Sequence, residues 1–489
     1  MAGPANRKRA RTVRPKFNVF SLLDHLTGRY VRGRYGLWYM NGGFSHMMGF
    51  AGRGNTFKSA FSSTCIATAS LRYEAEYTEF YDSEISLEPG RLQDFINSVA
   101  KNNYWKVIPQ LDELYESETT PWNHTASDTQ SGDEWWRDNN RNEIKGRSSL
   151  KDKDMRETPF KEIGGSFTRI PSPWFYNVDS LSEMHVAAVE KMYDKSDVGE
   201  SDLNTEALKD AGSKAQMMKQ MPVVGAKASI YYGLIAHADD EMKLDQYAPS
   251  QKKLGDLKGN LKLKGVPGRA FSFLTNNCFI AIAVGDAINR GDKMPEYPHP
   301  DAIARQGDTD LRFVKFQQLR GKSGPTGAVL DLVFSQKEGL LVGVTEFHNL
   351  KEVYTGYGME IKGNNQGFRL ELYPDTFFTR KTVRKILNED QKFGRAMSIT
   401  AAMAYINHNW YDIEPEMRIS PADLREKLIE RGFDWDKILE DSVEYWYFND
   451  QEESVGKLTL TAWTLLEMAV NGFDCPQLDR YRADKKKAA

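Results

Sequence analysis

A glycine-rich loop followed by a run of small and apolar residues is the feature that most constrains how this chain can fold. The loop covers residues 49–59 with the sequence GFAGRGNTFKS, and residues 60–67 continue as AFSSTCIA. Small residues let backbone N–H groups converge on phosphate oxygens, and the dipole of a helix N-terminus also favours an anion. A lysine and a hydroxyl at the helix start would add a mobile cation and a Mg²⁺ ligand. The pattern predicts a phosphate-binding loop that opens an α-helix.

The match to the phosphate-loop pattern fails at one position. Gly52, Lys58 and Ser59 fit the spacing G-x-x-x-x-G-K-[ST], but Phe57 stands where the second glycine belongs. The alternative interpretation is a glycine-rich turn in front of an ordinary helix, and the segment alone leaves both open. The residues expected to hold a nucleotide are Gly52, Gly54, Asn55, Thr56, Phe57, Lys58 and Ser59.

Three β-prone segments that end in polar residues are found beyond the loop. They are 77–84 (YTEFYDSE), 173–180 (PWFYNVDS) and 228–237 (ASIYYGLIAH). A carboxylate at the end of a buried strand is costly unless it is paired or lies near a metal. Each polar residue alone is more often a local cap, but the ordered series predicts an open α/β sheet with its site at the carboxyl edge.

The order of these segments resembles that of the RecA-type recombinases, most closely the phage UvsX-type branch, whose loop also has Phe before the Lys. The matching segments are TFKS at 56–59, FYDSE at 80–84, NVDS at 177–180, LIAH at 234–237 and FQQLRGKSGP at 316–325. The resemblance covers roughly residues 34–390. It implies an α/β fold, namely a RecA-like P-loop ATPase core with a mostly parallel central sheet.

The resemblance also implies a role for each matching residue in the hydrolysis of ATP with Mg²⁺. Lys58 would neutralise the β- and γ-phosphates, while Ser59 and Asp179 would hold the metal ion. Glu84 would be the general base for the attacking water. His237 would sense the γ-phosphate, although a histidine at a strand end is often only a satisfied structural residue.

Two further matches concern the neighbouring protomer and the base. Arg320 and Lys322 would place positive charge on the nucleotide of an adjacent protomer, although surface cations are usually only solvated. Arg91 stands where the family has an aromatic residue that stacks on adenine, and a guanidinium can also stack on a base.

A basic, glycine-rich stretch after the His237 segment is expected to contact DNA. Its basic residues are Lys252, Lys253, Lys258, Lys262, Lys264 and Arg269. Such a stretch suits a phosphate backbone, and the alternative is a solvated loop. The net charge of −3 does not exclude nucleic acid, because it averages this stretch and a basic N-terminal arm with an acidic remainder.

The chain is expected to divide into four parts. These are a basic N-terminal arm and polymerisation segment (1–33), the ATPase core (34–345) with an insertion at 112–165, a small lobe (346–395) and a helical extension (396–489). Helices are predicted at 401–409, 421–430 and 458–468. Residues 16–20 could dock on a neighbouring protomer or on the chain's own core. The tryptophans of the insertion could stack on bases or a partner, or simply pack.

The expected function is that of an ATP-dependent recombinase, encoded by a phage and located in the host cytoplasm. Head-to-tail filaments would bind single-stranded DNA and pair it with homologous duplex DNA. No apolar run approaches the ~20 residues that span a bilayer. Two rivals stay open: a hexameric helicase of RecA fold, disfavoured by the short stretch before Gly49, and a scaffold that binds nucleotide without turnover.

Overall fold

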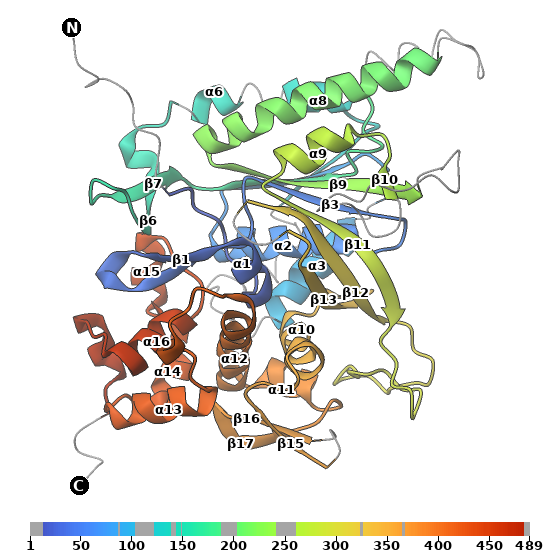
Figure 1. Ribbon diagram of the computed structural model, residues 1–489. Coiled ribbons are helices and arrows are strands. Elements are labelled where there is room, and N and C mark those ends of the chain that lie inside the picture. The colour runs from blue at the N-terminus through green and yellow to red at the C-terminus, as the bar shows by residue number, and fades with distance from the viewer. Residues whose placement is uncertain are drawn as a thin grey trace, which may run out of the picture.

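The computed structural model describes residues 13–86, 89–102, 122–137, 143–147, 149–186, 203–240, 261–322, 326–363 and 367–483. A large mixed β-sheet organises this part of the chain (Figure 1), with the strand order β14-β13-β12-β11-β3-β9-β8-β4-β5 and β10 paired to β9. The strands are β3 (Met47–Gly52), β4 (Tyr77–Asp82), β5 (Asn123–Ala126), β8 (Trp174–Asp179), β9 (Ile230–Asp240), β10 (Leu261–Leu263), β11 (Asn277–Asp286), β12 (Leu311–Gly321), β13 (Val329–Ser335) and β14 (Gly339–Leu340).

The centre of the sheet is parallel and one side of it is antiparallel. Strands β11, β3, β9, β8, β4 and β5 run parallel, as the three predicted segments and the helices between them require. Strands β12, β13 and β14 instead follow one another in antiparallel pairs. The connections from β12 to β13 and from β13 to β14 are short, as antiparallel neighbours allow, whereas parallel neighbours need a crossover. The predicted α/β class is therefore confirmed, and the sheet is mixed.

Helices cover both faces of this sheet, which explains why its central strands are continuously apolar. Helices α2 (Lys58–Arg72) and α3 (Pro89–Asn102) lie on one face, and α8 (Leu203–Ala228) and α9 (Gly268–Leu274) lie on the other (Figure 1). Successive side chains of a strand point to opposite faces. Accordingly, Met48 and Phe50 join the core beneath α2, while Met47 and Ala51 join the core beneath α8 and α9.

The N-terminal segment packs onto the chain's own core. Phe17 is fully buried and exchanges two backbone hydrogen bonds with Phe44. Its ring meets the edges of Tyr73 and Tyr231 at 4.7 Å and stacks on Trp446 at 5.5 Å. Of the two alternatives for residues 16–20, docking on the chain's own core is the one found. The apolar side chains of this segment thus have partners within the chain, and its role in polymerisation stays a prediction.

The aperiodic stretch at 112–165 contributes to the fold where it is described. Strand β5 forms the edge of the central sheet, and β6 (Met155–Lys161) and β7 (Phe167–Pro171) form a separate hairpin. Trp135 is fully buried and Trp122 stacks on Phe80 at 5.4 Å. Packing is therefore what occupies these tryptophans, and stacking on nucleic-acid bases is not open to them in this conformation.

The C-terminal half adds a small sheet and a group of helices. Its elements are α10 (Val342–His348), η4 (Asn349–Val353), β15 (Met359–Lys362), β16 (Gly367–Leu370), β17 (Tyr373–Phe378), α11 (Val383–Glu389), α12 (Gln391–Asn409), α13 (Pro421–Glu430), α14 (Trp435–Asp441), β18 (Ser442–Val443), α15 (Asn449–Val455), β19 (Leu458–Thr459) and α16 (Ala462–Asn471). The helix predicted at 421–430 is confirmed. The expected boundary between residues 395 and 396 falls inside α12.

Two of the predicted C-terminal helices begin elsewhere than expected. The helix at 401–409 starts earlier, at Gln391, because the Asp390 side chain caps it by accepting from the Phe393 N–H. The helix at 458–468 starts later, at Ala462, behind a Thr461 cap, since Leu458 and Thr459 pair with β18 instead. Local caps and a two-residue strand determine where these two helices begin. The pattern of apolar residues indicates neither the caps nor the strand.

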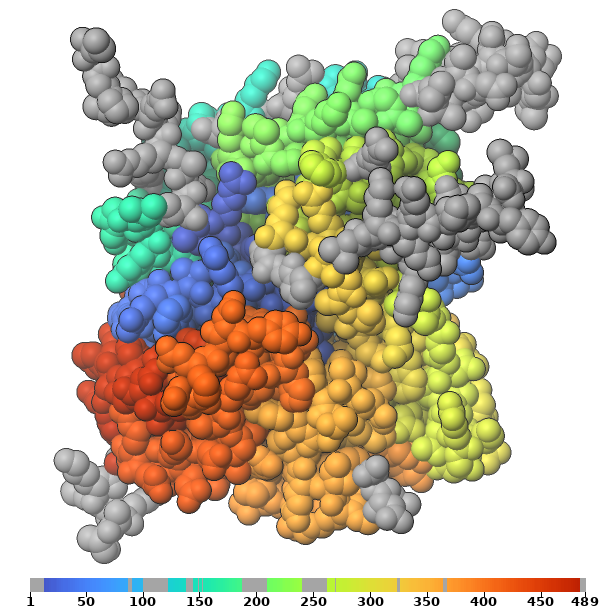
Figure 2. Space-filling model, in the orientation of Figure 1, coloured from blue at the N-terminus to red at the C-terminus, as the bar shows by residue number. Residues whose placement is uncertain are grey.

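An N-terminal ribbon lies beside C-terminal helices. Strands β1 (Arg29–Arg32) and β2 (Trp38–Asn41) form a ribbon against α15 and α16, and the blue N-terminal surface borders the red C-terminal one in Figure 2. The Trp38 backbone N–H donates to the Thr464 hydroxyl at 3.1 Å, and Arg34 pairs with Glu452 at 2.7 Å. No helix in the described ranges is both long and apolar enough to cross a membrane.

Candidate functional site

The glycine-rich loop connects β3 directly to α2. Strand β3 ends at Gly52, and α2 begins at Lys58 after the N-cap residue Phe57. Phe57 adopts the left-handed conformation, with φ 61° and ψ 17°, at the position where the pattern expects glycine. This conformation costs an L-residue ~1 kcal/mol or more. The Phe57 ring packs on Phe334 at 5.3 Å, which explains how a phenylalanine is held there.

The rest of the loop is compact at its base and exposed at its tip. The Thr56 hydroxyl donates to the Arg53 carbonyl at 2.8 Å and so closes the turn. A Cβ on Gly52 would lie 2.3 Å from that hydroxyl oxygen, so only glycine fits at this position. Gly54 has open space around it, and Arg53, Gly54 and Asn55 are exposed. The tip of the loop is therefore open to solvent.

Lys58 and Ser59 occupy the first turn of α2. Burial lowers the pKa of Lys58, whereas the nearby carboxylates of Asp179 and Glu84 act in the opposite direction. Within the described part of the chain, no hydrogen-bond acceptor is found for the Lys58 ammonium, although the residue is only 6% exposed. The Ser59 hydroxyl interacts with the Asp179 carboxylate and acts to lower its pKa. A buried cation and a hydroxyl thus stand together at a helix N-terminus.

Asp179 is the last residue of β8 and lies beside this helix turn. The pKa of Asp179 is raised to about 6, chiefly by burial and also by the neighbouring carboxylates of Glu84 and Asp82. The hydrogen bond from Ser59 and the charge of Lys58 act against this rise. A divalent cation at this position would favour the ionised carboxylate strongly.

Glu84 and His237 form a direct pair across the same edge. His237 Nε2 lies 2.6 Å from Glu84 Oε1. This hydrogen bond lowers the pKa of Glu84, with help from a bond to Ser180 and the charge of Lys58, against the effect of burial. His237 is paired with Gly52 in the β3–β9 register, and Asp82 is paired with Asp179 in the β4–β8 register. The predicted strand ends therefore converge at one edge of the sheet.

The structure adds polar residues that the sequence reading did not single out. Asn177 on β8 accepts a hydrogen bond from the Ser62 hydroxyl of α2 at 2.6 Å. The Ser83 hydroxyl donates to the Ser180 carbonyl at 2.6 Å and accepts the Ser180 N–H at 2.7 Å. The two hydrogen bonds between Ser83 and Ser180 hold together the ends of β4 and β8, near which the carboxylates lie. In the sequence, two features could have identified these residues: an Asn within an apolar strand and a Ser next to each acid.

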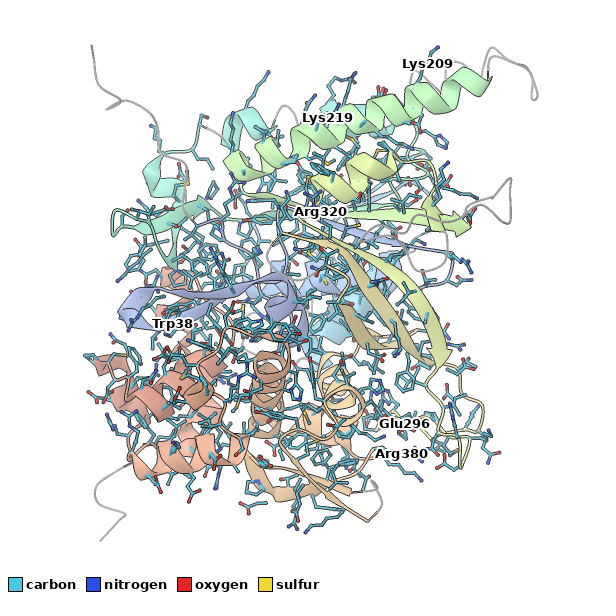
Figure 3. The ribbon with its side chains drawn as sticks, in the orientation of Figure 1. Trp38, Lys209, Lys219, Glu296, Arg320 and Arg380 are labelled. Carbon is cyan, nitrogen blue, oxygen red and sulfur yellow. The ribbon has the colours of Figure 1, made fainter. Side chains whose placement is uncertain are left out.

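Arg320 and Lys322 do not join this group within the chain. Through β11, Arg320 is level with Gly49, towards the start of β3 rather than its end. Figure 3 shows Arg320 at the upper end of β12, where its guanidinium lies 4.1 Å from the Phe273 ring. Lys322 is exposed at the surface, and the partial desolvation of its ammonium, together with the charges of Arg320 and Arg14, lowers its pKa. Both cations thus face another edge of the sheet.

Arg91 lies on α3, on the other side of α2 from the sheet's centre. Its guanidinium is 5.7 Å from the Phe95 ring and its side chain is exposed. A Cβ on Gly339 of β14 would lie 2.9 Å from Thr64 and 3.1 Å from Phe95, so α2, α3 and β14 meet closely. Arg91 therefore stands one helical turn from this junction.

The residues expected to bind DNA are only partly described. Lys252, Lys253 and Lys258 lie outside the described residues, as does the side chain of Arg269. Lys262 is exposed on β10. Lys264 follows that strand and forms an ion pair with Asp239. Strand β10 continues the sheet beside His237, since the Lys264 N–H donates to the His237 carbonyl at 2.9 Å.

A metal site made of protein side chains alone is not found among the described residues, because no three His, Cys, Asp or Glu side chains gather suitably. Ser59 and Asp179 nevertheless fit Mg²⁺, which is commonly held by one or two side chains together with phosphate oxygens and waters.

No protein-family model matches this chain, and no curated protein matches it either.

Proposed function

We propose that this chain is a DNA-dependent ATPase of RecA type that assembles on single-stranded DNA and pairs it with homologous duplex DNA. One observation supports this proposal above the others: the loop, Asp179 and the Glu84–His237 pair meet at the carboxyl edge of a parallel sheet. In open α/β sheets this edge is where ligands bind. The proposal includes the RecA-like form of the core.

The loop end of the site suits the triphosphate of ATP with Mg²⁺. The Lys58 ammonium, which has no acceptor of its own in the described chain, would neutralise the β- and γ-phosphates. Ser59 and Asp179 would hold Mg²⁺, and the positive charge of the ion would keep Asp179 ionised. The N–H groups of the exposed loop and the N-terminus of α2 would supply the remaining contacts.

Hydrolysis would require the Glu84–His237 bond to open. Glu84 would then accept a proton from a water molecule whose oxygen attacks the γ-phosphorus, and ADP would leave with the bridging oxygen. His237 would donate instead to a γ-phosphate oxygen, so the nucleotide and Glu84 compete for the same Nε2 atom. Binding and loss of the γ-phosphate would thereby move the end of β9.

The position of Arg320 and Lys322 supports a role in trans. They lie towards the start of β3, whereas Lys58 follows its end, so they are turned away from the loop of their own chain. A head-to-tail contact would bring them to a neighbour's nucleotide, and heterologous contacts of this kind generate helical filaments unless the ring closes. The Lys-rich stretch beyond β9 would contact the DNA backbone.

The proposal is tested by ATP turnover with and without single-stranded DNA. Wild type should hydrolyse ATP and be stimulated by DNA, whereas Lys58→Ala and Glu84→Gln should lose ~10²-fold or more of the rate. Glu84→Gln should still bind ATP, because it removes the base and leaves the loop intact. Lys219→Met, an exposed position on α8, is the matched control and should behave as wild type.

Other outcomes would lead to other functions. Equal and negligible rates in wild type and Lys58→Ala, with nucleotide still bound, would indicate a scaffold. Closed rings rather than filaments in electron microscopy on single-stranded DNA would indicate a hexameric helicase.

A further inference from the structure

A buried lysine on α8 joins chain segments that meet beside His237. Lys214 is 2% exposed, and its ammonium reaches three oxygen atoms. Asp210 Oδ2 lies at 2.7 Å, one helical turn away, and the carbonyl oxygens of Ser182 and Gly265 both lie at 3.0 Å. All three N–H bonds of the ammonium are therefore used.

The same segments are tied directly to the backbone of His237. The Ser182 hydroxyl accepts the His237 N–H at 2.8 Å and donates to the Lys264 carbonyl at 2.9 Å. The Lys264 N–H donates to the His237 carbonyl. Gly265 has φ +59°, and a Cβ there would lie 2.4 Å from the Ser182 carbonyl oxygen, so the two segments are in close contact.

Docking of α8 does not explain a lysine at this position. The helix already buries Met217, Met218 and Met221 against the sheet, each at most 7% exposed. A buried ammonium carries a desolvation cost that an apolar side chain of similar length would avoid. The geometry therefore favours a role for Lys214 that depends on the three interactions of its ammonium.

We propose that Lys214 is a positioning residue that couples residues 182–186 and 261–265 to His237. This inference rests on the proposed function, which assigns the stretch preceding Gly265 to DNA. A shift of either segment on binding DNA is transmitted through the ammonium and the Ser182 hydroxyl to the His237 backbone. His237 then changes its hydrogen bond to Glu84, and ATP turnover responds to DNA.

The test compares the DNA-free and the DNA-stimulated ATPase rates of Lys214→Met, Lys214→Arg and the control Lys219→Met. Lys219 lies on the same helix but is exposed, as Figure 3 shows. Lys214→Met should reduce the ratio of stimulated to DNA-free rate roughly five-fold or more. Lys214→Arg should have a ratio closer to that of wild type, because arginine keeps the positive charge and the hydrogen-bond donors. Lys219→Met should leave it unchanged.

A purely structural role would lower both rates by the same factor and leave the ratio unchanged, which would overturn the inference. If Lys214→Met does not fold, Ser182→Ala serves instead, since it removes only the hydroxyl that bridges to His237. An unchanged ratio in a folded Ser182→Ala would likewise overturn the inference. Absence of any DNA stimulation in wild type would instead overturn the proposed function, so the two failures are distinguishable.

Discussion

Asp179 ends strand β8 and Glu84 follows the neighbouring strand β4, and the surroundings of these two carboxylates shift their pKa values in opposite directions. Burial raises the pKa of Asp179 to about 6, whereas the hydrogen bond from His237 lowers the pKa of Glu84. Pairs of acids with separated pKa values commonly divide the roles in a site. Here a cation would keep Asp179 ionised even below pH 6, whereas Glu84 would be ionised without one.

The raised pKa of Asp179 predicts how stability depends on pH in the absence of nucleotide. Between about pH 4 and pH 6 the folded protein holds this proton while the unfolded chain releases it, so stability falls as the pH rises through this window. Asp179→Asn abolishes this loss. We expect it to stabilise the protein at pH 8 by about 1–3 kcal/mol and to have little effect near pH 4.

Denaturant unfolding at both pH values measures this difference. The matched control is Asp412→Asn at an exposed position, which should show no such pH dependence. A stability gap of equal size at pH 8 and pH 4 would contradict the assignment of the raised pKa to Asp179.

At the scale of elements, the connection from β3 to α2 shows how a loop can keep its geometry after losing a glycine. The backbone at Phe57 is left-handed, and the ring is packed on Phe334 of β13. Two effects at Phe57 therefore oppose each other: backbone strain destabilises the folded protein and side-chain packing stabilises it. Substitution by Gly removes both, whereas substitution by Ala removes only the packing.

This difference gives a paired prediction. Phe57→Ala should be less stable than Phe57→Gly by ~1 kcal/mol, because alanine keeps a Cβ in the left-handed conformation. Elsewhere glycine usually destabilises relative to alanine, so the reversed order identifies the conformation. Unfolding free energies of the two variants provide the measurement, and an alanine variant at least as stable as the glycine variant would rule the explanation out.

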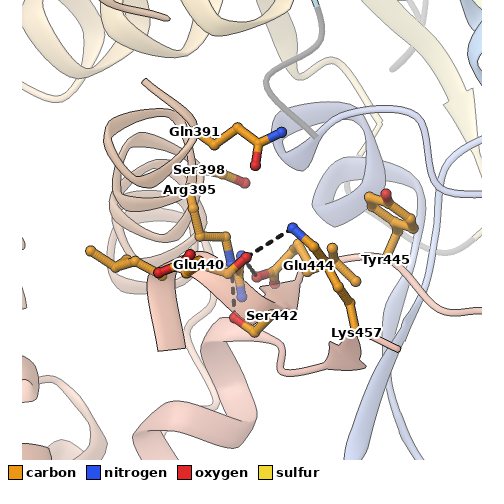
Figure 4. A pocket seen from close by; sticks show the side chains of 10 residues that line it. Gln391, Arg395, Ser398, Glu440, Ser442, Glu444, Tyr445 and Lys457 are labelled. Atoms are coloured by element: carbon orange, nitrogen blue, oxygen red, sulfur yellow. Dashed lines mark hydrogen bonds and ion pairs between the residues drawn. The ribbon is translucent and has the colours of Figure 1, made fainter. Parts of the chain in front are cut away.

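At the scale of the whole molecule, a buried ionic group links the N-terminal and C-terminal parts. Figure 4 shows Arg395 of α12 pointing at Ser442 and Glu444, in a small cavity of about 30 Å³. Arg395 lies 3.0 Å from Glu444 and 3.2 Å from Ser442. Glu444 also accepts from the Tyr30 hydroxyl at 3.2 Å and from the N–H of Ala462 at the start of α16.

Removal of the arginine should destabilise the entire chain. Arg395→Met leaves Glu444 buried without its cation, and breaking a buried pair in this way costs about 3–5 kcal/mol. The double variant Arg395→Met/Glu444→Gln should recover part of the loss, because the neutral amide needs no counter-ion. Thermal and denaturant unfolding test this, and a double variant less stable than the single one would contradict it.

The polar strand ends of the central sheet could be predicted because their signals are local. A glycine-rich loop before a helix, and acids or a histidine at the ends of apolar runs, need only neighbouring residues to be recognised. Parallel strands then bring their carboxyl ends to one edge by geometry alone. Strands are found within the segments 77–84 and 173–180, and the strand predicted at 228–237 instead begins at Ile230 and continues past His237 to Asp240. Their roles in ATP hydrolysis stay predictions.

The remaining features depend on contacts between distant residues. Phe17 packs on Trp446, Trp135 becomes a buried donor to Glu79 at 3.0 Å, and Lys214 meets Ser182 and Gly265. The periodicity of apolar residues does not indicate such partners, because each of these side chains contacts residues that are distant in the sequence. The sequence by itself determined the loop, the strand type and the polar ends, since these follow from backbone preference and burial. Only the tertiary structure decided which polar groups meet, because hydrogen bonds depend on positions in space.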